Sequence, residues 1–474
     1  MSHHTIDNAL DQTRVKIVDS ENKNPRRSSQ NDEFVNQCKY VNFFGVQFQM
    51  NKTQFITIVL LMGYFFLSAA YYSLFAPFFP SEAINKHLSK TQIGIIFGMF
   101  ELVIFILSPY FGKNLEHFGI RFLFVGGLFI NSGSQFLFGF LDLCPDGIMF
   151  FIMCIVCRAV TGIGVSMGLS FAIVGHYFPD RISFFVSLLE IFNGLGFMIG
   201  PIIGGFLYQL GGFRLPFFVM GGFLFLLFIV ALLFFPDVRD CTQPRENLSM
   251  IPFLKIPRLI ITLLLVFMCA LSIGFVQPSI ELHLLPLNLS PIQIAFILMA
   301  PSLLYIVSTP LIGYLCDKYK NLMKWFMLFS TLIAAISFGL IAPMPILNLK
   351  FNLLTFMMGY LGFGLSIGGL AIPGYSELLR IATENGYAND LRTQGVISGL
   401  FSSIWSSGSL VGPIVGGFVV DKIGFELAST GIVFAFLISA VISIFFLIHD
   451  SCCIFTRNRY TDPLLPESAP LLTN

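Results

Sequence analysis

Apolar runs of about 20 residues recur twelve times along the 474-residue chain, separated by shorter polar or charged stretches. A helix needs about 20 apolar residues to cross the hydrocarbon core of a bilayer, so this recurrence predicts an all-α polytopic membrane protein. The composition agrees, since 55% of the residues are hydrophobic and only 11% are charged. Soluble proteins have about a quarter of their residues charged. The runs lie near residues 54–77, 92–112, 121–142, 148–172, 183–208, 216–236, 257–280, 291–315, 323–343, 352–376, 393–419 and 427–448.

Several classes of function are excluded by the charge and the motif content. A formal net charge of +1 argues against a nucleic-acid partner. The sequence contains no nucleophile–base set, phosphate-binding loop or cluster of metal ligands. We therefore expect neither an enzyme nor a bound cofactor or metal.

Positive charges are unevenly distributed between the two sides of the expected membrane spans. Twelve spans put both termini on one side, which carries 21 Lys and Arg against five on the other, and Arg158 lies within a span. Both termini are therefore expected in the cytosol. The expected organisation is a disordered tail (1–52), a six-helix bundle (53–236), a cytosolic linker (237–256), a second six-helix bundle (257–449) and a cytosolic tail (450–474).

The two halves of the chain repeat one another. The segment "SPYFGKNLEHFG" (108–119) parallels "TPLIGYLCDKYK" (309–320), and "GFMIGPIIGGFLYQLGGF" (196–213) parallels "GSLVGPIVGGFVVDKIGF" (408–425). The offsets are 201 and 212 residues, so one six-span unit occurs twice. Paired units of this kind place a transport site near the bilayer midplane, where they meet.

Two motifs within these repeats resemble signatures of the major facilitator superfamily. The G-x3-GP-x2-GG pattern in the fifth and eleventh spans is similar to its antiporter signature, and the glycines allow close helix packing. The G-x3-D/E loops that contain Glu116 and Asp317 resemble its cytosolic gating motif, although the first copy keeps only Arg121 of the basic cluster. The resemblance implies two pseudo-symmetric six-helix bundles and a gate or ion-pair role for Glu116 and Asp317. The antiporter motif consists of Gly196, Gly200, Pro201, Gly204, Gly205, Gly408, Gly412, Pro413, Gly416 and Gly417.

Longer stretches narrow the resemblance to one family. These are "RAVTGIGVSMGLSFAIVGHYFPDR", "SLLEIFNGLGFMIGPIIGGFLYQLGGFRLPF" and "ENGYANDLRTQGVISGLFSSIWSSGSLVGPIVGGFVVDKIGFELA". They resemble the vesicular amine transporters (solute carrier family 18), and most nearly the vesicular polyamine transporter branch. The likeness extends over about residues 54–448. It implies exchange of an amine for protons.

One glutamate, Glu101, interrupts the second apolar run, "IIFGMFELVIFILSP" (95–109), close to mid-membrane. An ionisable group at that depth costs roughly 2.5–3.5 kcal/mol on insertion scales and is functional by default. One carboxyl group that either holds a proton or pairs with an ammonium is the minimum requirement for exchanging the two. The alternative is structural: Glu101 is a partner of Arg158, or a protonated acid bonded to a backbone carbonyl.

Four further charged residues lie in or near the spans: Glu190 in the fifth, Arg158 in the fourth, Glu377 at the cytosolic end of the tenth and Glu281 at the lumenal end of the seventh. Glu190 is expected to share proton coupling or to form a buried ion pair with Arg158. Arg158 is expected as a gate or structural partner, since a cation would repel a cationic cargo. Glu377 and Glu281 are expected to be coupling acids or solvated vestibule acids.

Four acids and one arginine suggest a cationic cargo, and more than one acid suits a multivalent cation. The monoamine branch is expected to carry acids where this chain has Ser68, Gln277, Gly368 and Ser402, so its substrate carboxylates are missing. Aromatic rings near the pathway can bind an ammonium, or they simply pack. The expected aromatic and polar cavity residues are Tyr71, Tyr72, Tyr305, Trp405, Gln277 and Ser402.

The chain ends with a sorting pattern. The segment "ESAPLL" (467–472) fits E-x3-LL, with Glu467, Leu471 and Leu472 as the residues that clathrin adaptor proteins read. Together with the family resemblance, it favours secretory or synaptic vesicles or another acidic endomembrane.

The sequence thus predicts a proton-coupled antiporter, monomeric in the lipid bilayer, that loads polyamines such as spermidine and spermine into acidic vesicles. One alternative is an antiporter of monoamines, acetylcholine or other organic cations. Another is a non-transporting membrane sensor on the same scaffold, which would bind its ligand without proton-coupled flux.

Overall fold

The computed structural model describes residues 39–43, 46–74, 78–236, 250–276, 283–284, 291–342 and 352–460. The chain divides into two compact units, residues 1–59 and 60–474, and each is described by itself. Within the described ranges, twelve helices are long and apolar enough to cross a membrane, and they coincide with the twelve expected runs.

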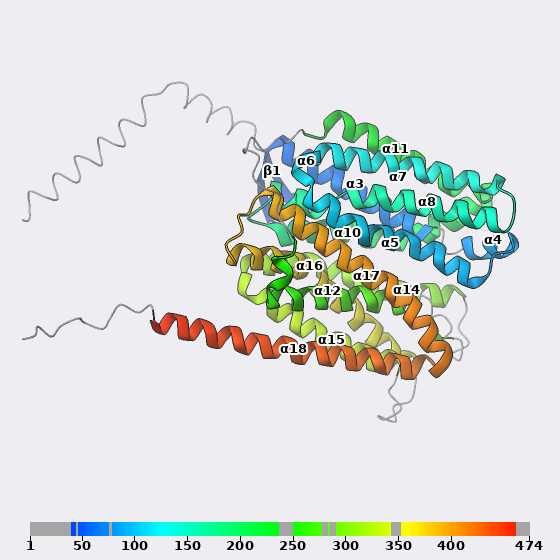
Figure 1. Ribbon diagram of the computed structural model, residues 1–474. Helices are drawn as coiled ribbons and strands as arrows, with labels where there is room; N and C mark the ends of the chain where they lie inside the picture. Colours follow the sequence, from blue (N-terminus) through cyan, green and yellow to red (C-terminus); the bar gives the residue numbers. More distant parts are fainter. Residues whose placement is uncertain are drawn as a thin grey trace, which may run out of the picture. The chain divides into compact units, whose positions relative to one another are not determined.

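The helices of the larger unit form two halves. The first half contains α3 (Lys52–Leu74, which begins in the smaller unit), α4 (Phe79–Asn85), α5 (Lys90–Lys113), α6 (Leu115–Phe118), α7 (Ile120–Gly139), η1 (Phe140–Leu143), α8 (Ile148–Met167), α9 (Ser170–Tyr177), α10 (Ile182–Gly211) and α11 (Arg214–Phe234). The second half contains η2 (Phe253–Lys255), α12 (Pro257–Val276), α14 (Pro291–Lys318), η4 (Lys320–Leu322), α15 (Met323–Ile341), α16 (Leu353–Glu384), α17 (Leu391–Ile423) and α18 (Phe425–Tyr460). Figure 1 shows α6 and α4 at opposite ends of the long helices, and these are called the α6 end and the α4 end below.

Local sequence fixes where several long helices begin. Ser89 and Gln92 form a capping box at the start of α5. The side chain of Asn352 accepts a hydrogen bond from the Thr355 amide at the start of α16, and Asp390 caps α17 in the same way. No side chain from its own N-terminal residue caps α10.

Each half has its own hydrophobic core. The core of the first half contains Phe79, Phe138 and Phe217, and that of the second contains Phe275, Phe338 and Phe436. The halves meet mainly where α5 packs on α17 and where α10 packs on α14. These two helix pairs therefore position any site shared by the halves.

Two boundaries differ from the sequence-based expectation. Residues Lys39–Phe43 and Val46–Met50 form an antiparallel hairpin within the tail that was expected to be disordered. Alternation of apolar and polar residues over "VQFQM" is the period-2 pattern of a strand, which explains the difference. Helix α18 also continues beyond residue 449 to Tyr460, because its sequence contains neither Gly nor Pro between Gly431 and Pro463.

Candidate functional site

Glu101 lies on α5, where this helix packs against α17. Its side chain is only 8% exposed. The hydroxyl groups of Ser406 on α17 and Tyr72 on α3 lie beside its carboxyl group, and Arg158 acts on it electrostatically. Hydroxyl groups can donate to a carboxylate or accept from a protonated carboxyl group, so this environment accommodates both forms of Glu101.

Arg158 of α8 is fully buried beside Glu101. Its Nη1 donates a hydrogen bond to the Tyr71 hydroxyl over 3.4 Å. Among the described residues, the guanidinium also lies against three aromatic rings, whose π-faces attract a cation. The distances from Cζ to the ring centroids are 5.2 Å for Phe100, 5.7 Å for Phe97 and 6.0 Å for Tyr72. Arg158 is therefore held as a fixed positive charge next to Glu101.

Glu190 of α10 bonds to the other half of the molecule. The Tyr305 hydroxyl of α14 donates to its Oε2 over 2.8 Å, and Asn193 donates to the same oxygen over 2.9 Å. The expected ion pair between Glu190 and Arg158 is not formed. The reason lies in the helix packing, because α10 packs on α14 whereas α8 packs on α5 and α7.

Asp317 and Glu116, from the two copies of the gating motif, both bind across the halves at the α6 end. Asp317 of α14 accepts hydrogen bonds from the backbone amides of Ser183 (3.0 Å) and Phe184 (2.8 Å) in the first turn of α10. This carboxylate supplies the cap that the sequence of α10 lacks, and negative charge is favourable at a helix N-terminus. Arg392 of α17 donates to Glu116 of α6.

Each of these acids is preceded, about one helical turn earlier, by a glycine that lets its helix approach the other half closely. A Cβ atom on Gly112 would lie 2.3 Å from the Gly395 carbonyl oxygen of α17, and one on Gly313 would lie 2.5 Å from the Ser187 hydroxyl of α10. The two copies thus join the halves by different chemistry, an ion pair at Glu116 and a helix cap at Asp317. Arg121, the remaining basic residue of the first copy, donates to the Leu232 carbonyl within its own half.

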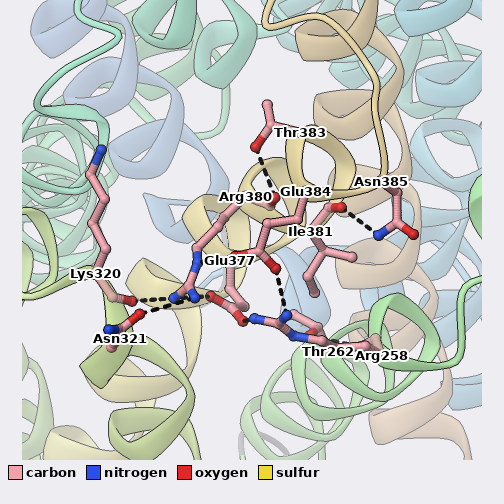
Figure 2. A network of polar contacts seen from close by, with 10 residues as sticks. All are labelled: Arg258, Thr262, Lys320, Asn321, Glu377, Arg380, Ile381, Thr383, Glu384 and Asn385. Carbon is pink, nitrogen blue, oxygen red and sulfur yellow. Dashed lines mark hydrogen bonds and ion pairs between the residues drawn. The ribbon is translucent and has the colours of Figure 1, made fainter. Parts of the chain in front are cut away.

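Glu377 lies in a network of ion pairs at the α6 end of the second half (Figure 2). Its side chain is 2% exposed and pairs with Arg258 of α12 at 2.5 Å and with Arg380 at 3.6 Å. Glu384 binds the same two arginines at 2.6 and 2.7 Å. The network ties the start of α12 to the end of α16, which favours a structural role for Glu377 over that of a solvated vestibule acid.

The antiporter motif mediates close helix contacts. Cβ atoms on Gly196, Gly200 and Gly204 of α10 would lie 2.2–2.4 Å from backbone carbonyl oxygens of α3. On α17, Cβ atoms on Gly408 and Gly412 would lie 2.5–2.6 Å from carbonyl oxygens of α12. A Cβ on Gly205 would meet open space. Pro201 and Pro413 lie within α10 and α17, and the surroundings of Gly416 and Gly417 fall outside the described part of the chain.

The remaining expected site residues are divided between the core and the undescribed segments. Trp405 stacks on Phe401, with ring centroids 6.0 Å apart, and packs against the core of the second half. Ser402, on the same helix, is half-buried. The residues outside the described ranges are Gln277, Glu281, Glu467, Leu471 and Leu472.

Several residues at these sites were not singled out from sequence as site residues. Arg258, Arg380 and Arg392 each lie near the end of a span. The sequence indicated only that they add to the positive charge on the cytosolic side. Ser406 lies beside Glu101 because of the rotation of α17, which the sequence alone does not reveal. No group of three or more potential metal ligands occurs among the residues that the structure describes.

Comparisons with known proteins give consistent matches. The model of the Major Facilitator Superfamily matches residues 60–391. The rat MFS-type transporter SLC18B1 is 35% identical over 407 residues, which cover 85% of this chain and 89% of that protein. The human MFS-type transporter SLC18B1 is 38% identical over 361 residues, covering 76% and 78%. The multidrug resistance protein MdtG of Enterobacter lignolyticus is 25% identical over 399 residues, covering 80% and 88%.

Among solved structures, the human organic anion transporter MFSD10 (TETRAN) matches with a TM-score of 0.68. The match covers 82% of this chain and 99% of that one at 15% identity, so it concerns the fold alone. These matches confirm the expected fold class, an all-α polytopic membrane protein with the twelve-helix major facilitator fold.

Proposed function

We propose that this chain, which belongs to the major facilitator superfamily and within it to solute carrier family 18, exchanges protons for polyamines such as spermidine and spermine. The family places the chain among transporters rather than enzymes, and it is a multi-pass membrane protein. Exchange with protons and the choice of polyamine form the proposal.

The observation that carries the proposal is the environment of Glu101. The carboxyl group is buried, lies between the two halves and has neighbours that suit both of its forms. A proton and a cargo ammonium can each neutralise it, and only one of them can do so at a time. Such mutual exclusion is what exchange requires.

Energetics explain why a multivalent cation needs exchange. Moving one positive charge into a lumen that is positive by 100 mV costs about 2.3 kcal/mol, and a trivalent polyamine faces roughly three times that. Each proton that leaves down one pH unit returns about 1.4 kcal/mol plus its own electrical term. Uniport would therefore exclude this cargo from the lumen.

In the proposed cycle, the α6 end faces the cytosol, as do both termini. The bridges at Glu116 and Asp317 open to admit the polyamine, which pairs with Glu101 and Glu190. The halves then rock, and lumenal protons neutralise these acids and expel the amine. Arg158 keeps a fixed charge beside Glu101, so that the acid rather than its neighbour changes state.

The compartment and the partners follow from the same proposal. An acidic secretory or synaptic vesicle supplies the protons, and the pattern formed by Glu467, Leu471 and Leu472 offers clathrin adaptors a sorting address. We propose that the transporter works as a monomer in the bilayer.

The test is uptake into liposomes with an acidic interior. Native protein should accumulate labelled spermidine, Glu101→Gln should not, and Glu426→Gln at the start of α18 serves as the matched control. Uptake of serotonin or acetylcholine alone would show that the cargo is another organic cation and not a polyamine. Binding without uptake would favour the sensor, and undiminished proton-driven uptake by Glu101→Gln would refute the assignment of this residue.

A further inference from the structure

We infer that Tyr305 is a positioning residue: its hydroxyl bridges the two halves by holding Glu190, and a proton or a cargo ammonium on Glu190 breaks that bridge. This inference rests on the proposed function. It adds how a proton or an ammonium group on Glu190 changes the contact between the two halves.

The first support is the buried position of the Tyr305 ring, beside glycines of α10 and α16. The residue is 8% exposed, and its ring lies between two glycines. A Cβ on Gly194 of α10 would lie 3.4 Å from Cδ1, and a Cβ on Gly368 of α16 would lie 3.6 Å from Cδ2. Because neither glycine carries a Cβ atom, the ring has room between α10 and α16, and its hydroxyl reaches Glu190 at 2.8 Å.

The second support is the set of groups around the carboxylate. Among the described residues, Asn193 and Tyr305 are the hydrogen-bond donors to Glu190, and only Tyr305 comes from the other half. Within the described part of the chain, the other titratable group that acts on this pair is the buried thiol of Cys269 on α12. Glu190 is itself half-buried.

The third support is the chemistry of the bond. A phenol that donates to an ionised carboxylate makes a charge-assisted hydrogen bond, roughly twice as strong as a neutral one. Protonation of Glu190 therefore weakens the bridge. A primary ammonium is a charged donor with three hydrogens, so it competes with the phenol for the same oxygens.

The helix pair that carries this bridge also carries one of the bonds at the α6 end. Asp317 lies twelve residues after Tyr305 on α14, about 18 Å along the helix axis, and caps α10. When a lumenal proton breaks the Tyr305 bond while the cap is closed, α14 stays attached to α10 at the cap. The two helices can then tilt about that point, which is the motion that rocking requires.

The first measurement needs no cargo. Thermal unfolding of Tyr305→Phe is compared with the native protein at pH 8 and pH 5 in lipid nanodiscs, with Tyr360→Phe in the core of the second half as the matched control. We expect Tyr305→Phe to lower Tm clearly at pH 8 and little at pH 5, whereas Tyr360→Phe has the same effect at both. An equal loss at both pH values for Tyr305→Phe would overturn the proton-sensitive bridge.

A second variant guards against a simple packing defect. Glu190→Gln removes the charge, so adding Tyr305→Phe to it should change Tm little at either pH. A further loss at pH 8 as large as that in the native background would show that the hydroxyl acts elsewhere.

The second measurement is equilibrium binding of labelled spermidine at pH 8. Because the ammonium no longer competes with the phenol, folded Tyr305→Phe should bind about 3- to 10-fold more tightly. Unchanged or weaker binding would overturn the competition with cargo. A native chain that binds no spermidine would refute the proposed function. The Tm comparison needs no cargo, so it would still show whether the bond from Tyr305 to Glu190 is sensitive to protons.

Discussion

The ion pairs around Arg258 give a quantitative test of how this fold uses buried charge. Arg258 binds Glu377, whose side chain is 2% exposed, and Glu384, which is 40% exposed. Removing one member of a buried pair costs about 3–5 kcal/mol, whereas an exposed pair contributes about 0.2–1 kcal/mol. Because Arg258 is 23% exposed and Arg380 stays 3.6 Å from Glu377, we reduce the buried value to about 2 kcal/mol.

The assay is a pair of double-mutant cycles that share Arg258→Ala, one with Glu377→Gln and one with Glu384→Gln. The free energy of unfolding is measured by denaturation with sodium dodecyl sulfate in mixed micelles. We expect a coupling energy of about 2 kcal/mol between residues 258 and 377, and below about 1 kcal/mol between 258 and 384. The exposed pair is a control on the same arginine.

A coupling of Arg258 to Glu377 no larger than its coupling to Glu384 would show that burial does not strengthen this ion pair. The same variants also separate two roles of Glu377. A structural role predicts that Glu377→Gln lowers stability with the KM for spermidine unchanged. A cargo-binding role predicts a raised KM in a protein of native stability.

Three further predictions concern packing, a helix cap and pH. Gly112→Ala should cost about 1–3 kcal/mol or more, because its Cβ would meet backbone of α17, whereas Gly94→Ala on the same helix meets nothing within 4 Å and should be neutral or stabilising; unfolding of both variants checks this. Asp317→Asn should cost about 1 kcal/mol of unfolding free energy, because the first turn of α10 loses a charged cap. Burial lowers the pKa of His283 below its usual value, so its contribution to stability is complete above about pH 6.5 and is lost as the pH falls through the lowered value. His283→Phe should therefore lose less Tm than the native protein between pH 7 and pH 5, and an equal or greater loss would contradict this sign.

The membrane spans could be predicted because hydrophobic length alone determines them. Glu116 and Asp317 could be found because their motif occurs in both halves. Their partners could not be found, since contacts such as Glu116 with Arg392 join residues 276 positions apart. Which side of a helix faces the other half depends on its rotation, so neither the bond from Tyr305 to Glu190 nor the absence of one from Arg158 was visible in the sequence.

The two helix pairs that join the halves are built alike. In each pair the first half supplies a carboxyl group within a span, Glu101 on α5 or Glu190 on α10, and the second half supplies a hydroxyl neighbour, Ser406 on α17 or Tyr305 on α14. Each pair is also joined by a gating-motif acid at the α6 end. Neutralising one carboxyl group would loosen one pair and leave the other in place. In the proposed cycle, movement of whole halves therefore requires both acids to change state, and we expect a cargo with two or more ammonium groups to do this in a single binding event.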